Sequence, residues 1–141
     1  MERVKYLVPL VLAAFLLSAC ATEFAWRRAV TETIRIPTTT ANYVMDTADN
    51  FLDMGRITAE QHAQIKDLFN KGEKIQKQAI KAAKIANDAA DVQERDAWLE
   101  EYDRVLTELR GLIYELIDLA KEWGILGEKA ALGLKLSMEV K

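Results

Sequence analysis

The chain has 141 residues and a formal net charge of −3 at pH 7, with 19 Lys and Arg against 22 Asp and Glu. Such a chain lacks the basic excess typical of proteins that bind nucleic acid, so DNA and RNA are not expected as partners. Only 6 Gly and 2 Pro occur, and Ala, Leu, Lys and Glu are plentiful, which predicts a single all-α domain.

The first twenty residues have the three parts of a secretory signal peptide. Arg3 and Lys5 give a short positively charged start, residues 6–17 are apolar except for Pro9, and small residues precede Cys20. The apolar run is shorter than the roughly 20 residues that a membrane-spanning helix needs. We therefore predict that residues 1–19 are a signal peptide, which is removed and leaves residues 20–141 as the mature chain.

The sequence Leu17-Ser18-Ala19-Cys20 resembles the lipobox of bacterial lipoproteins, in which the Cys becomes the first residue and carries diacylglycerol. The resemblance implies lipidation of Cys20 by fatty acids such as palmitate. Cys20 is the only Cys, so no disulfide can form within the chain, and lipidation would remove an unpaired thiol. In Gram-negative lipoproteins an Asp after the Cys usually marks retention in the inner membrane. Ala21 stands there instead, which resembles the outer-membrane pattern facing the periplasm. The alternatives are an ordinary cleaved signal with a free Cys, or an uncleaved anchor.

Residues 20–40 are expected to form a flexible tether behind the lipid. Residues 31–40 are rich in Thr, and Pro37 disfavours helix at Ile36. Trp26, Arg27 and Arg28 lie close to the lipid in sequence, and Trp suits a membrane interface while Arg reaches anionic headgroups. A disordered spacer with an incidental Trp is the alternative interpretation.

The helical domain is predicted to span residues 41–124. Its first helix runs over about residues 39–54 and ends at Gly55. The second covers about residues 59–87, because Thr58 stands at an N-cap and Gln61 has the spacing of a capping box. Steps of three and four residues give this helix a thin heptad seam: Ile65, Leu68, Gly72, Ile75, Ala79, Ala82, Ala86 and Ala89.

The third helix has a stronger seam of the same spacing. Its residues are Leu99, Tyr102, Leu106, Leu109, Ile113, Leu116, Ala120 and Trp123, with Trp98, Val105, Leu112 and Leu119 in an adjacent row. Such a wide apolar face can contact two neighbouring helices. We predict that it is the core face of a helical bundle or, alternatively, a surface that binds a partner.

The second and third helices form either an antiparallel hairpin or one long rod, because no Gly or Pro separates them. Asp91 and Glu94 have the spacing of a capping box, which indicates a new helix start. Residues 66–84 are basic and residues 91–122 are acidic, so the two segments would attract each other, although exposed pairs contribute only about 0–1 kcal/mol each. We therefore favour the hairpin; in the rod, the same charges favour antiparallel pairing of two molecules.

Residues 125–141 are expected to be a flexible or short helical tail. Gly127 and Gly133 loosen this segment, and residues 134–141 alternate apolar and polar side chains as a strand does. A single strand has no partner in a helical domain, although it could pair with the sheet edge of another protein.

No arrangement of residues predicts catalysis. His62 is the only His, and Ser137 is the only Ser after Cys20; they lie in unrelated segments without a motif, and His62 is expected on the surface. The acidic residues in 100–103 and 115–122 have the spacing of a solvated helix face. No Cys and His cluster predicts a metal site. We expect no enzymatic activity, no cofactor and no metal.

The sequence thus predicts a membrane-anchored lipoprotein of the bacterial envelope, whose helical domain binds a protein partner or self-associates as a coiled coil. In outline it resembles secretin pilotins, phage spanin subunits and exclusion lipoproteins, but nothing after Cys20 matches a family motif. The alternative function is binding of a lipid or small apolar ligand inside the bundle. Trp98, Tyr102, Ile113 and Trp123 would then line the cavity.

Overall fold

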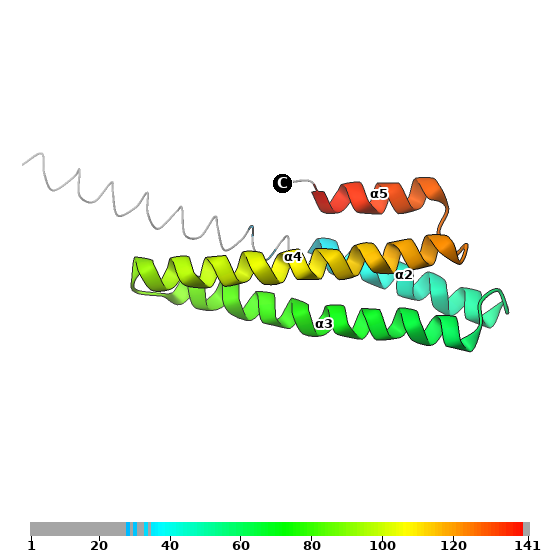
Figure 1. Ribbon diagram of the computed structural model, residues 1–141, viewed down its shortest axis with the longest axis horizontal. Coiled ribbons are helices and arrows are strands. Elements are labelled where there is room, and N and C mark those ends of the chain that lie inside the picture. Colours follow the sequence, from blue (N-terminus) through cyan, green and yellow to red (C-terminus); the bar gives the residue numbers. More distant parts are fainter. Residues whose placement is uncertain (1–27, 29, 31–32, 34, 140–141) are drawn as a thin grey trace, which may run out of the picture.

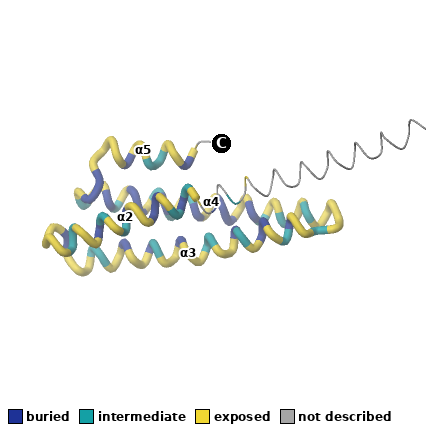
Figure 2. The backbone as a smooth tube through the Cα atoms, turned by 180° about the vertical axis from the view of Figure 1, so that it is seen from behind, coloured by how far each residue is buried: buried dark blue, intermediate teal, exposed yellow. Residues whose placement is uncertain are grey.

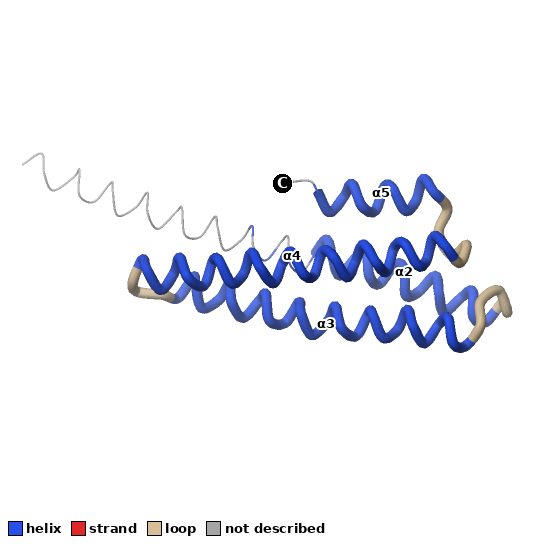
Figure 3. Tube along the Cα trace, in the orientation of Figure 1, coloured by secondary structure: helices blue, strands red, loops and turns tan. Residues whose placement is uncertain are grey.

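The computed structural model describes residues 28, 30, 33 and 35–139, and four helices in this part of the chain pack as a bundle (Figures 1 and 3). They are α2 (Ile36–Asp53), α3 (Ala59–Asp88), α4 (Val92–Glu122) and α5 (Glu128–Glu139). α3 and α4 form a long antiparallel hairpin, α2 packs along both, and α5 packs on α4 and α2. The predicted all-α bundle is therefore confirmed for the described residues. The predicted signal peptide and Cys20 lie outside them.

The chain reverses between α3 and α4 at residues 89–91, which confirms the hairpin and excludes the rod. Asp91 is the N-cap of α4, as predicted, and its carboxylate accepts a hydrogen bond from the backbone N–H of Gln93 at 3.3 Å. This bond satisfies one of the four N–H groups that the first turn leaves without a partner in the helix.

The two predicted seams meet in the core between α3 and α4 (Figure 2). On α3 the buried seam residues are Ile65, Leu68, Gly72, Ala79, Ala82 and Ala86. Of the seven α4 residues predicted for the core or partner face, five are buried: Tyr102, Leu106, Leu109, Ile113 and Leu116. Trp123 is half-buried against this cluster. The face therefore forms this chain's own core.

Leu99 is the exception in this set, because its side chain is 37 % exposed. It lies near the hairpin turn, which projects beyond the start of α2 (Figures 1 and 2). Ile117 lies on the same side of α4, five turns further along, and is fully buried where α2 runs beside α4. For Leu99 the core alternative of the prediction is thus corrected, and the residue lies exposed on the apolar side of α4: periodicity gives a residue's side of the helix, while burial depends on whether a neighbour extends that far.

Charge attraction does not hold the hairpin together in the way that the sequence indicated. Among the described residues, no ion pair joins α3 to α4. Lys71 pairs with Asp67 inside α3 at 2.9 Å, and Arg104 pairs with Glu101 inside α4 at 2.7 Å. The apolar seams therefore hold the two helices together, and most of the basic residues of α3 are free to face solvent.

α2 begins at Ile36 with Pro37 in its first turn, ahead of the predicted helix start at residue 39. Proline is tolerated there because the first N–H groups of a helix have no acceptor within it. Pro37 and Thr40 are buried in the bundle. The expected end of the tether at residue 40 is thus corrected, because residues 36–40 belong to the bundle. Of the tether itself, residues 20–27 lie outside the described residues.

Contacts that precede α2 extend this correction to Thr33. Its hydroxyl lies 2.8 Å from the hydroxyl of Tyr102 in a buried hydrogen bond. The side-chain amide of Gln76 donates to the Thr33 carbonyl at 3.0 Å and also to the hydroxyl of Thr38. Thr33 and Thr38 are therefore hydrogen-bonded to α3 and α4, which ties the chain at the start of α2 to the bundle.

The connection from α2 to α3 follows the prediction closely. Gly55 has a φ of 67°, the left-handed conformation that ends helices, so the predicted stop is confirmed. The Thr58 hydroxyl accepts from the Gln61 N–H at 3.1 Å, and the Thr58 N–H donates to the Gln61 side chain at 2.9 Å. The predicted capping box is thus confirmed.

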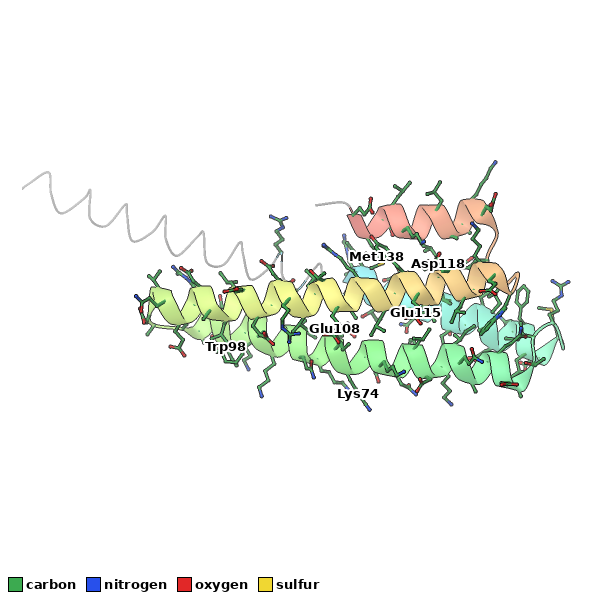
Figure 4. All side chains as sticks on the ribbon, in the orientation of Figure 1. Lys74, Trp98, Glu108, Glu115, Asp118 and Met138 are labelled. Carbon is green, nitrogen blue, oxygen red and sulfur yellow. The ribbon has the colours of Figure 1, made fainter. Side chains whose placement is uncertain are left out.

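The C-terminal tail forms α5, so the short helix is the correct alternative, and neither a strand nor a flexible segment describes residues 128–139. Ala131 and Met138 are buried, and the ammonium group of Lys135 lies 2.6 Å from the carboxylate of Asp118 on α4 (Figure 4). Ala131, Lys135 and Met138 follow each other at steps of four and three residues, so they lie on one side of α5. Packing on α4 thus selects the helix over the strand-like alternation of its sequence.

Gly72 offers a test of how tightly the thin seam of α3 is packed. A Cβ atom added there would lie 3.8 Å from Ile113 Cδ1 and 3.9 Å from Leu109 Cδ1, which are ordinary van der Waals distances. Gly72→Ala is therefore expected to raise the free energy of unfolding by about 0.5–1 kcal/mol, because Gly loses more conformational freedom in a helix than Ala does. Thermal denaturation followed by circular dichroism measures the change.

The matched control is Gly111→Ala in α4, where an added Cβ meets nothing within 4 Å. It reports helix propensity alone and should also stabilise the bundle. If Gly72→Ala destabilises the protein while Gly111→Ala stabilises it, the helices pack more closely at Gly72 than described.

Candidate interaction surface

The two residues considered for catalysis have separate partners. The His62 ring nitrogen Nε2 lies 2.6 Å from the Asp49 carboxylate, which joins α3 to α2, and the His62 side chain is 16 % exposed. It is therefore more covered than the sequence suggested. The Ser137 hydroxyl donates to the Leu134 carbonyl at 2.7 Å within α5. The two side chains thus take part in different contacts of the bundle.

The acidic residues do not gather into a metal site in the part of the chain that the structure describes. No group of three or more His, Cys, Asp or Glu side chains there could hold a metal ion. Two carboxylates on α4 instead pair with the same basic neighbour. Arg104 contacts Glu101 at 2.7 Å and Glu108 at 3.6 Å, and its hydrogen bond holds the pKa of Glu101 below the ordinary value.

Between the described parts of α2, α3 and α4, the interior of the bundle leaves little room for a ligand. A pocket of about 70 Å³ lies between α2, α3 and α4, lined by residues that include Pro37, Ala41, Phe69, Gln76 and Ile113. Ligand pockets usually enclose about 300–1,000 Å³. Of the four residues expected to line a lipid cavity, Ile113 alone lines this pocket. A larger depression of about 410 Å³ between α3 and α4 is open to solvent, and charged and polar side chains form much of its lining.

The outer side of α3 carries a row of exposed lysines. Lys74, Lys77, Lys81 and Lys84 follow each other at steps of three and four residues, opposite the buried seam of the same helix. We call these four residues the lysine face. At 1.5 Å per residue it is about 15 Å long, and Lys74 points away from α4 (Figure 4). None of the four forms an ion pair with a described residue.

The outer side of α4 near the hairpin turn is acidic. Asp96, Glu100 and Asp103 are exposed and follow each other at steps of four and three residues. They lie on the same side of α4 as Asp118, which faces α5 and not α3. The hairpin therefore has positive charge on one side and negative charge on the other. The sequence showed both charge runs, but their directions depend on how the two seams meet.

No helix in the described part of the chain has the length and apolar content needed to span a membrane. Comparison of the sequence with protein-family models gives no match, and comparisons with curated proteins and with solved structures give no significant match. The function therefore has to be argued from the residues of this chain.

Proposed function

We propose that this protein is a lipoprotein of the bacterial envelope, held at a membrane by lipid on Cys20, and that its helical bundle is a structural and protein-interaction module. The observation that carries the proposal is the lipobox-like Leu17-Ser18-Ala19-Cys20 directly after a charged and an apolar segment. Each buried methylene of an acyl chain contributes about 0.8 kcal/mol, so several chains anchor a protein stably. Ala21 favours the outer membrane, on its periplasmic side.

Three features of the bundle support interaction through its exterior. The seams of α3 and α4 are buried within one chain, so the fold needs no partner to complete its core. A spanin-like role would require the apolar face of α4 to bind a partner helix, and that face is already covered by this chain's own helices. The small internal pocket likewise disfavours storage of a lipid. Exposed apolar residues remain on α5, where Leu132 and Leu136 face outward.

Metabolic labelling with an alkyne fatty acid tests the anchor. We expect label on a mature N-terminal peptide that begins at Cys20, identified by mass spectrometry. An unlabelled chain that still begins at Met1, or a free thiol at Cys20, would contradict the proposal.

Photo-crosslinking in the native envelope tests the interaction module. A photoreactive amino acid at exposed Leu132 is expected to give an adduct with another protein, whereas the same group at buried Leu109 should give only internal crosslinks. Adducts of Leu132 with copies of this chain alone would show self-association, and no adduct at all would count against an interaction role for α5.

A further inference from the structure

We propose that the lysine face of α3 docks on anionic phospholipid headgroups of the membrane that holds Cys20, so that the bundle lies with α3 against the bilayer and α4 turned away. This inference rests on the proposed lipid anchor. It assigns a role to Lys74, Lys77, Lys81 and Lys84, which the packing of the bundle does not use.

The lysine face has no carboxylate partner among the described residues, which separates it from three paired lysines of the bundle; Lys66 and Lys129 also form no ion pair but do not belong to a row of four. Lys71 pairs with Asp67 at 2.9 Å, Lys121 with Glu128 at 3.5 Å and Lys135 with Asp118 at 2.6 Å. Glu73 and Asp88 lie at the two ends of the row, and neither forms an ion pair with it. Four ammonium groups are therefore available along one straight helix.

A membrane surface suits this arrangement because the lysine side chain is a flexible point charge that needs no fixed geometry. Each Lys held near an anionic bilayer raises the association constant for that bilayer roughly fivefold. This electrostatic attraction fades within a Debye length of about 8–10 Å from the surface. An anchor at Cys20 would hold the bundle near the bilayer surface and make docking an intramolecular step.

The acidic side of α4 determines which way the bundle would turn. Asp96, Glu100 and Asp103 are exposed on the side of α4 away from α3, so an anionic surface repels that side and attracts the lysine face. A second copy of the chain could offer the same acidic residues to the lysines. The contact between two copies would consist of exposed, salt-screened ion pairs without an apolar centre. A second copy would therefore bind the lysine face more weakly than the anionic bilayer does.

Footprinting of amines tests the inference on the lipidated mature protein in vesicles. One vesicle type contains phosphatidylcholine alone, and the other also contains phosphatidylglycerol. We expect acetylation of the lysine face to be at least about threefold slower in the anionic vesicles, since each Lys gains roughly fivefold in association. Lys129, exposed on α5, is the internal control and should react equally in both. High salt should abolish the difference.

A second readout uses variants with unchanged folding. A dye attached to Asn70→Cys, which is exposed on the same side of α3, should change its emission in anionic vesicles. K74Q/K77Q/K81Q/K84Q should remove this response. The charge-matched control R56Q/K71Q/K121Q/K129Q has the same net charge and should retain the response. It removes two exposed ion pairs, and such pairs contribute little to stability, so both variants should still unfold cooperatively above the temperature of the assay.

Docking of the lysine face and lipidation of Cys20 can fail independently in these experiments. An anchored chain with equal acetylation in both vesicle types overturns docking alone. Protection of the lysine face in detergent, increasing with protein concentration, also overturns it and shows a second copy as the occupant. A purified chain without lipid on Cys20 overturns the anchor and this inference together.

Discussion

Replacing Leu109 with Asp is expected to unfold the bundle at ordinary temperature. Leu109 lies in the α4 seam and is 1 % exposed. Loss of its side chain alone costs about 2–5 kcal/mol, and the new carboxylate would be buried without a partner, which adds to the cost. Small domains have a total stability of about 5–15 kcal/mol. We therefore expect loss of the helical circular dichroism signal and of the cooperative thermal transition.

Leu132→Asp is the matched control, because it makes the same chemical change at a site that is 59 % exposed. It should alter the free energy of unfolding by less than about 0.5 kcal/mol. If both variants melt at the same temperature as the parent protein, the seam is not a core and the face of α4 must serve another purpose. If both unfold, the outward side of α5 is packed in solution, as it would be in an oligomer.

Cys20→Ala is expected to release the protein from the membrane. The variant cannot form a thioether with lipid, and the apolar segment before it is shorter than a membrane-spanning helix requires. Membranes washed with carbonate should retain almost none of the variant, while they retain nearly all of the parent chain. Electrophoretic mobility should change as well, since lipid and processing at Cys20 both alter it.

Ala21→Asp provides the control, because it leaves Cys20 in place and should leave the protein membrane-bound. The lipobox resemblance implies that this variant moves from the outer to the inner membrane of a Gram-negative cell. A Cys20→Ala chain that stays membrane-bound with unchanged mobility would show that something other than lipid holds the protein. The lipoprotein proposal would then be wrong.

The ionisable residues of α3 and α4 with shifted pKa values interact mainly with partners on their own helix. Lys71 and Glu101 each have a partner within their own helix, and their pKa values move accordingly, Lys71 upward and Glu101 downward. Asp67, four residues away, is the main cause for Lys71, with a smaller contribution from Glu115 on α4, and Arg104, three residues away, is the cause for Glu101. The opposite charges of α3 and α4 act between helices, and there the apolar seams set the distance and direction of the side chains. The opposite charge runs therefore predicted correctly that α3 and α4 are neighbours, but the apolar seams and not ion pairs hold the two helices together.

The amino-acid sequence by itself determined α3, α4 and several helix ends. The capping box of Thr58, the N-cap at Asp91 and the left-handed Gly55 involve residues at most four positions apart, so local chemistry is sufficient. The heptad spacing likewise determined which sides of α3 and α4 are apolar. Periods of three and four residues depend on the geometry of one helix and not on its surroundings.

The tertiary structure alone decided where the apolar sides of α3 and α4 are buried. The hydroxyls of Thr33 and Tyr102 meet across 69 positions of sequence, so part of the segment predicted as a tether is attached to the bundle. The extent of α2 leaves Leu99 exposed, and packing on α4 makes residues 128–139 a helix. Each outcome depends on a neighbour that is distant in the chain. The helix propensities of different residue types differ by only about 1 kcal/mol per residue, and burial of an apolar side chain against a distant neighbour outweighs that difference.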